Sequence, residues 1–263
     1  MQAIQIAMLS CVLSLVPTLI WGSIFLYKHN EKRSLLIKTY VYGACMVLPL
    51  ILYRYSFQIF ESQEFIFGLI SQSILILFLT IGFLEEYLKH LVTRFTDQKE
   101  IQTIDDAIEF SIVAALGFAF AENTFYFIEV YQALGEEVFY QTIVLRSLFA
   151  TFAHTFFSSI YGLYYGKELF ASNIYNHLPK NNSKKRFLKS VSQVLTFLSP
   201  KQLFKNQMRL YGILLAGLTH TAYNVLLELE FVHFLIPFMV IGFYMILNMI
   251  WSRKNHVKYK TID

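Results

Sequence analysis

The fold is decided by the stretch Ile81-Gly82-Phe83-Leu84-Glu85-Glu86-Tyr87-Leu88-Lys89. Its two adjacent carboxylates, Glu85 and Glu86, follow a segment, 65–84, that is otherwise almost purely apolar. Ionisable groups at membrane depth are costly, and they are rare unless they have a function. We therefore predict that the two glutamates belong to a functional site inside a membrane-spanning helix. The alternative is that the helix ends at Leu84 and that the glutamates are an ordinary polar flank.

The composition of the whole chain supports a membrane protein. Only 15% of the 263 residues are charged, 56% are hydrophobic and the mean hydropathy is +0.47, whereas soluble domains carry about 25% charged residues. Repeated apolar runs reach the length of about 20 residues that crosses a bilayer. We predict an all-α fold, a single polytopic membrane helix bundle over residues 1–263. The short segments of alternating hydrophobicity that are typical of a transmembrane β-barrel are absent from the sequence. The expected transmembrane helices are seven: 4–27, 35–56, 65–88, 107–130, 139–166, 210–228 and 231–251.

The basic residues predict how these helices are oriented. Of the 22 Lys and Arg residues, all but Arg54 and Arg146 lie in or beside the loops after the first, third and fifth spans or in the C-terminal tail, if Lys89 is counted with its loop. Cytoplasmic loops are enriched in Lys and Arg, so we expect the N-terminus outside and the C-terminus in the cytoplasm. The longest of these loops, 167–209, is basic. Its apolar residues recur with helical spacing around 187–198, which is typical of an interfacial helix on anionic lipid, although a solvated linker is an equal alternative.

Three further ionisable residues lie inside the later spans: Glu122, His154 and His220. Asn224 follows His220 by one helical turn and shares its face. A single buried histidine is more often a core residue than a catalyst, but several such groups in separate spans indicate a shared intramembrane site. The other five histidines lie at loops or span ends and receive no role. The predicted boundaries also raise a conflict, because they place Glu85 nearer the cytoplasm and Glu122 in the outer half.

Known catalytic motifs narrow the chemistry. None of the four Asp residues lies inside a predicted span, so an aspartyl intramembrane protease would lack its pair of acids. The chain has no His-Glu-x-x-His motif and no Gly-x-Ser-x-Gly motif. A carboxylate can still act as general base on water, with imidazole and amide groups donating to an oxyanion. The same residue types could ligate a metal, and spacing alone does not separate these two mechanisms.

The order of the motifs resembles the PrsW family of intramembrane proteases, relatives of the type II CAAX prenyl proteases. The resemblance rests on short motifs in four separate spans, and it covers roughly residues 10–230. The motifs are Glu85-Glu86-x-x-Lys89, Phe118-x-x-x-Glu122-Asn123, Arg146 followed by His154, and His220-x-x-x-Asn224.

The resemblance implies a membrane-embedded endopeptidase that hydrolyses a peptide bond with carboxylate-activated water. Glu85 would be the base, supported by Glu86, and His220 with Asn224 would bind the oxyanion. Glu122 stands where the CAAX enzymes have a histidine, and His154 would supply the missing imidazole. The expected supporting residues are Lys89, Asn123 and Arg146. We expect no metal; if zinc is bound, the candidate ligands are Glu85, Glu122, His154 and His220.

The implied partners are the lipid bilayer and a membrane-anchored protein substrate, which in PrsW proteins is an anti-sigma factor. No nucleic acid is expected, the oligomeric state is left open, and the expected location is a bacterial plasma membrane. Two other functions stay open on the residues alone. One is a non-catalytic scaffold subunit of the same fold, and the other is a proton-coupled transporter, in which buried Glu and His relay protons.

Overall fold

The computed structural model describes most of the chain, namely residues 2–28, 30–56, 65–66, 70–96, 98–194, 197–252 and 257. Within these residues the fold is all-α apart from one short antiparallel pairing of β1 with β2. The elements in chain order are α1 (Gln2–Lys28), η1 (Asn30–Lys32), α2 (Arg33–Cys45), α3 (Val47–Ser56), β1 (Phe65–Ile66), β2 (Ile70–Ser71), α4 (Gln72–Thr96), α5 (Ile104–Leu134), α6 (Glu136–Leu145), η2 (Arg146–Ala150), α7 (Thr151–Leu169), α8 (Ala171–His177), α9 (Ser183–Val194), α10 (Pro200–Glu228), η3 (Val232–Phe234) and α11 (Leu235–Trp251).

Five helical segments of the described chain are long and apolar enough to cross a membrane: Ala3–Lys28, Arg33–Leu52, Glu136–Leu169, Pro200–Glu228 and Val232–Trp251. They correspond to five of the seven predicted spans. The other two predicted spans correspond to α4 and α5, which are long helices but are not among these five. The helical fold is therefore confirmed, while the number of spans and their orientation stay predictions.

Several predicted boundaries were wrong. The third span was expected at 65–88, but α4 begins only at Gln72 and continues to Thr96, because the apolar residues before it include the β1–β2 pairing. The second span is interrupted at Met46, between α2 and α3. The sixth span was expected at 210–228, but α10 begins at Pro200, inside the loop predicted at 167–209. The helical segment expected around 187–198 of that loop is present in part as α9, and α8 lies in the loop as well.

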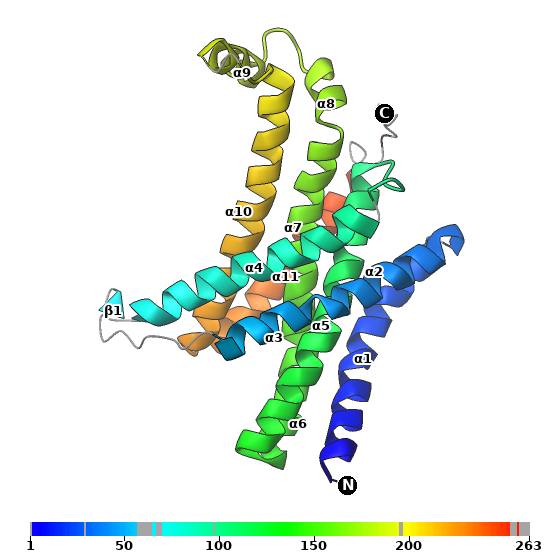
Figure 1. Cartoon of the computed structure of the whole chain (residues 1–263), viewed down its shortest axis with the longest axis vertical. Coiled ribbons are helices and arrows are strands. Elements are labelled where there is room, and N and C mark those ends of the chain that lie inside the picture. The colour runs from blue at the N-terminus through cyan, green and yellow to red at the C-terminus, as the bar shows by residue number, and fades with distance from the viewer. Residues whose placement is uncertain are drawn as a thin grey trace.

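The core of the molecule is built on α5. Its first turn is fixed by a capping box, in which the Thr103 hydroxyl accepts from the Asp106 N–H and the Asp106 carboxylate accepts from the Thr103 N–H, both at 2.9 Å. Almost every residue from Ile104 to Ala119 is buried. The helix packs against α7, α2 and α1, and α7 packs in turn against α10. In Figure 1, α4 runs across α7 and α10, which run lengthwise.

Two close helix contacts depend on glycine. A Cβ on Gly117 would lie 1.9 Å from the Tyr40 carbonyl oxygen, and one on Gly43 would lie 2.1 Å from the Ala114 carbonyl oxygen, so α2 and α5 touch through their backbones. A Cβ on Gly82 would lie 2.8 Å from the Thr221 hydroxyl oxygen. The resulting approach of α4 to α10 brings the face of Glu85 and Glu86 toward His220.

Candidate active site

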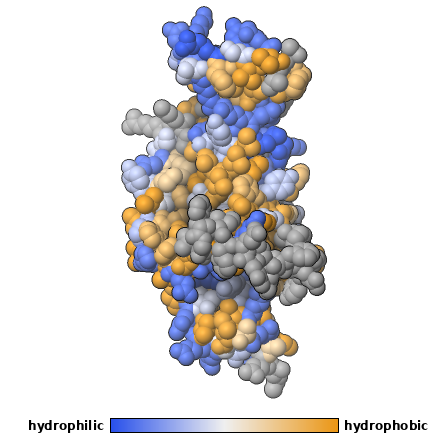
Figure 2. Space-filling model, turned by 90° about the vertical axis from the view of Figure 1, so that its left-hand side faces the viewer, coloured by the Kyte–Doolittle hydropathy of each residue, from blue (hydrophilic) through white to orange (hydrophobic). Residues whose placement is uncertain are grey.

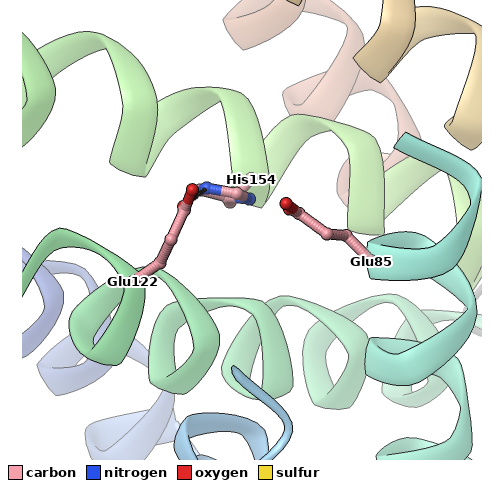
Figure 3. A group of neighbouring side chains, drawn as sticks. All are labelled: Glu85, Glu122 and His154. Carbon is pink, nitrogen blue, oxygen red and sulfur yellow. Dashed lines mark hydrogen bonds and ion pairs between the residues drawn. The ribbon is translucent and has the colours of Figure 1, made fainter. Parts of the chain in front are cut away.

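Five elements bring the predicted site residues to one place near the middle of the bundle. Helix α4 supplies Glu85, Glu86 and Lys89, α5 supplies Glu122 and Asn123, η2 supplies Arg146, α7 supplies His154, and α10 supplies His220 and Asn224. Figure 3 shows the side chains of Glu85, Glu122 and His154 pointing toward one another from three helices. One ligand atom of each lies within 4.8 Å of those of the other two.

The conflict between the positions of Glu85 and Glu122 came from the predicted helix boundaries, and the structure removes it. Because α4 begins at Gln72 and not at residue 65, Glu85 lies near the middle of its helix and not toward its end. Glu122 also lies in the interior of a longer helix than expected, α5. The crossing of α4 over the bundle then brings the two carboxylates together. Lys89, which was counted with a cytoplasmic loop, is likewise inside α4 and only 2% exposed.

Glu86 is fixed by several donors from three helices. The Lys89 ammonium donates to Oε1 at 2.6 Å, and the Ser158 hydroxyl donates to Oε2 at 3.3 Å. The His220 Nδ1 lies 3.1 Å from the Glu86 Oε1. With 1% of its surface exposed, Glu86 is an anchor for Lys89 and His220. These contacts fit a positioning role for Glu86.

His154 connects the α4 charges to Glu122. Its Nδ1 lies 2.8 Å from the Lys89 Nζ, and its Nε2 lies 2.8 Å from the Glu122 Oε2. An ammonium group can only donate, so Nδ1 accepts from Lys89. The ring proton is then on Nε2, which donates to the Glu122 carboxylate. The geometry thus assigns the tautomer of His154.

Glu122 is oriented by Arg146, and Asn123 holds Arg146 in place. The Arg146 guanidinium pairs with the Glu122 Oε2 at 3.1 Å and donates to the Asn123 Oδ1 at 2.8 Å. The Asn123 amide donates in turn to the Thr151 hydroxyl at 3.2 Å. Arg146 begins the π-helical segment η2, and such irregular turns are frequent at functional sites.

Glu85 lies farther than Glu86 from the two groups that they share, Lys89 and His220. Its Oε2 lies 3.8 Å from the Lys89 Nζ and 3.7 Å from the His220 Nε2. It lines a cavity of about 460 Å³, as do Glu122, His154, His220 and Asn224. The His220 ring stacks on Phe157 at 4.7 Å between centroids, which fixes its plane. Two carboxylates, two imidazoles and an amide therefore face a single cavity.

Some residues of this site were not singled out from the sequence. Ser158, which donates to Glu86, follows His154 by one turn, and Thr151 precedes it by one turn. That spacing places all three near one face of α7 and could have revealed them. His90, which received no role as a span-end histidine, is instead 3% exposed, and its Nε2 lies 2.7 Å from the Tyr161 hydroxyl. It is buried because α4 continues past it.

The same residues fit a metal ion. Glu85, Glu122 and His154 offer two carboxylate oxygens and one imidazole nitrogen, a donor set that zinc accepts in catalytic sites. The three carboxylates of the site also outnumber its two permanent cations, Lys89 and Arg146, so an additional positive charge would be balanced. His220, the fourth predicted ligand, lies beside this group, with its Nε2 3.7 Å from the Glu85 Oε2.

Comparison with known proteins identifies the family. A family model described as "PrsW family intramembrane metalloprotease" matches residues 31–185, more than half of the chain. The chain belongs to the PrsW family. It is a multi-pass integral membrane protein, and the relatives described below are bacterial. The matched range includes Glu85, Glu122 and His154, while His220 and Asn224 follow its end.

The curated relatives agree with this family. The Protease PrsW of Shouchella clausii is 28% identical over 88% of this chain and 87% of its own length. The Protease PrsW of Geobacillus kaustophilus is 30% identical, over 54% of this chain and 57% of its own length. The one of Oceanobacillus iheyensis is 33% identical over 53% of this chain and 59% of its own length. The last two matches thus span little more than half of those relatives. No solved structure matches the chain.

Proposed function

We propose that this PrsW protein is an intramembrane endopeptidase that hydrolyses a peptide bond in a membrane-anchored protein, with Glu85 as the base that activates water. One observation supports this most directly: Glu85 lines the cavity beside Glu122 and His154, whereas its neighbour Glu86 is engaged by Lys89, His220 and Ser158. Of the two adjacent acids, only Glu85 is among the described residues that line the cavity. A base must reach water and substrate, while a positioning residue must not move.

The remaining residues fit the other requirements of peptide hydrolysis. Glu85 would accept a proton from water as the oxygen attacks the carbonyl carbon, and would then return the proton to the leaving amine. His220 and Asn224 line the same cavity from one helix and would donate to the oxyanion. His220 would do so from Nε2 as an imidazolium, because its Nδ1 proton is held by Glu86. His154 would hold its Nε2 proton on Glu122, with Lys89 fixing the ring from the other side. Arg146 would orient Glu122 through their ion pair.

The family description adds a metal to this picture. Glu85, Glu122 and His154 would hold the ion, which would act as a Lewis acid and increase the acidity of a bound water. In that case Glu85 would be a ligand. The His154 ring would carry its proton on Nδ1 and not on Nε2, and the Lys89 ammonium would then donate to Glu85 and Glu86 in place of His154. Lys89 and Arg146 would still orient the ligand side chains, as they do in the present geometry.

We also propose the finer features of topology and substrate. The chain would cross the membrane seven times, with α4 and α5 among the spans, the N-terminus outside and the C-terminus in the cytoplasm. The resemblance to PrsW implies a membrane-anchored anti-sigma factor as one substrate of this class. Membership of a protease family favours this function over the scaffold and the transporter.

The proposal can be tested with the purified full-length chain in lipid vesicles that also contain a single-pass membrane protein. We expect cleavage by the wild type and an uncut substrate with Glu85→Gln. The matched control is Glu136→Gln, at an exposed glutamate in the first turn of α6, which should cut normally. Equal cleavage by Glu85→Gln and the wild type would contradict the proposal.

A chelator separates the two versions of the mechanism. If activity is lost with 1,10-phenanthroline and returns with added zinc, the site works with a metal. If cleavage is unchanged by the chelator and is still lost in Glu85→Gln, the glutamate acts on water without one.

A further inference from the structure

A second and larger cavity lies away from the candidate active site, at the end of the molecule formed by α8 and α9. Its volume is about 1070 Å³, and it is lined by parts of α7, α8, α9, α10 and α11. Ligand sites of this size are mostly apolar with a few convergent polar groups. This cavity has that character, because Phe204, Met208 and Met249 form part of its wall and a small number of polar residues face it.

The polar part of the wall is basic. Lys167 from α7 and Lys184 from α9 both line the cavity, and the two are close enough to repel each other electrostatically. None of the described residues that line it is Asp or Glu. Within the described part of the chain neither lysine forms an ion pair; each ammonium instead lies over an aromatic ring, Lys167 over Tyr164 at 4.8 Å and Lys184 over Phe204 at 4.7 Å.

Two facts indicate that an anion would stabilise this arrangement. Partial burial lowers the pKa of Lys184, because the charged form loses hydration. In addition, Ser183 and Lys184 are the first residues of α9, so the positive end of its helix dipole lies at the cavity wall. Two desolvated ammonium groups and a helix N-terminus together match the charge of a phosphate group.

Helix α9 indicates where such a phosphate would come from. It is strongly amphipathic. Its basic residues, Lys184, Lys185, Arg186 and Lys189, are interspersed in the sequence with the apolar residues Phe187, Leu188 and Val191. Leu188 packs inward, while Phe187 and Val194 are 63% and 81% exposed. At the top of Figure 2, hydrophilic and hydrophobic side chains lie next to each other at this end of the molecule. A basic amphipathic helix with exposed apolar residues is typical of the membrane interface, at the level of lipid phosphates.

We propose that this cavity binds an anionic membrane lipid, with the phosphate at Lys167 and Lys184 and the upper acyl chain against Phe204, Met208 and Met249. The shared chemistry of the ligand is a phosphate group, and the apolar wall selects the phosphate that carries a hydrocarbon chain. This site is separate from the candidate active site, and the inference does not depend on the proposed peptide hydrolysis.

The experiment is a lipid titration of the full-length protein, purified and delipidated in detergent, with bound lipid counted by native mass spectrometry. We expect dioleoylphosphatidylglycerol to bind and dioleoylphosphatidylcholine to bind much more weakly. Replacing both lysines, Lys167→Gln with Lys184→Gln, should weaken phosphatidylglycerol binding roughly thirtyfold. Each lysine near anionic lipid contributes about 1 kcal/mol, and every 1.4 kcal/mol changes the affinity about tenfold. The matched control removes the same charge from exposed residues that neither line the cavity nor belong to α9, with Lys180→Gln and Lys201→Gln, and should bind as the wild type does.

Three results would overturn the proposal. The first is equal affinity of the wild type for the two lipids, and the second is an equal loss in the test and control variants. The third is displacement of phosphatidylglycerol by millimolar inorganic phosphate, which would identify a site for free phosphate. If the double variant fails to fold, the comparison of the two lipids and of phosphate on the wild type decides the matter.

Discussion

Among the described residues, two groups of carboxylates in the bundle interior can be compared, the candidate active site and a group at the start of α5. In the candidate active site, Glu85, Glu86 and Glu122 lie in helix interiors. In the other cluster, Asp105 and Glu109 lie in the first turns of α5 and both pair with Lys28 of α1, Asp105 at 2.9 Å. We call this second group the α1–α5 clamp. Asp105 is 4% and Glu109 1% exposed, so the clamp is as deeply buried as the site.

The difference lies in what surrounds the acids. The site has two imidazoles, His154 and His220, and a cavity that they share with Glu85 and Glu122. Neither acid of the clamp is among the described residues that line this cavity. The lysine of the clamp is also half exposed, so the pair can be screened by solvent. A buried charge therefore indicates function only when it comes with space for a ligand and with groups that transfer protons.

The sharpest test of this contrast exchanges one glutamate in each cluster. Glu122→Gln should reduce the rate of substrate cleavage in vesicles by about 10²-fold or more, because the carboxylate that orients His154 and Arg146 loses its charge. Glu109→Gln should leave the rate close to that of the wild type and lower the thermal stability instead. The two changes lie in the same helix and remove the same charge.

The opposite result would break the contrast. If Glu109→Gln abolished cleavage in a protein that still folds, while Glu122→Gln cut normally, the active site would have to be placed at the clamp. Size-exclusion profiles in detergent would show whether each variant folds.

A second pair compares the buried histidines of α4 and α10. His220 contacts Glu86 at 3.1 Å and lines the cavity, while His90 contacts the Tyr161 hydroxyl. We expect His220→Gln to lose about 10²-fold in the cleavage rate at saturating substrate, the effect of one missing oxyanion donor. His90→Gln should change this rate little. Equal losses in both variants would indicate that His220 acts only through packing.

The sequence could predict the site because its residues are chemically conspicuous. Glutamate and histidine are rare in apolar spans, so Glu85, Glu122, His154 and His220 are evident even without a structure. The structure brings all four together with Glu86, Lys89, Asn123, Arg146 and Asn224. Whether these residues catalyse the reaction stays a prediction that the experiments above address.

The parts that could not be predicted depend on distant residues. Glu109 lies in a predicted span but was not singled out, and its partner Lys28 is far away in the chain and looks like an ordinary loop lysine. His90 looked like a span end because hydropathy does not show that α4 continues to Thr96. Hydropathy also does not reveal the break between α2 and α3 at Met46, since the residues on both sides are apolar. Tertiary contacts decide these features, and hydropathy does not record them.

A third comparison tests the helix packing that positions the site. Gly117→Ala would place a methyl group 1.9 Å from the Tyr40 carbonyl oxygen, so α2 and α5 would have to separate. Overpacking of this kind costs about 1–3 kcal/mol, and we expect a lower melting temperature in detergent. Gly22→Ala is the matched control, because nothing lies within 4 Å of its added Cβ. It should be neutral or slightly stabilising, since Ala favours helix over Gly. An equal effect of both changes on the melting temperature would mean that the close α2–α5 contact at Gly117 does not limit stability.

The smallest expected effect concerns the clamp itself. Lys28→Met removes the ammonium group that pairs with Asp105 and Glu109 but keeps much of the side-chain length. Breaking a fully buried ion pair costs about 3–5 kcal/mol, but Lys28 is 44% exposed, so solvent and salt reduce the loss to about 1–2 kcal/mol. Thermal unfolding in detergent should show this loss, and Lys28→Arg should restore most of it because the charge returns. Cleavage should be unaffected in both variants, since the lysine lies outside the cavity of the site. A large loss of cleavage in Lys28→Met, with unchanged thermal stability, would mean that the clamp contributes to catalysis. A buried charge would then indicate function even where no cavity adjoins it.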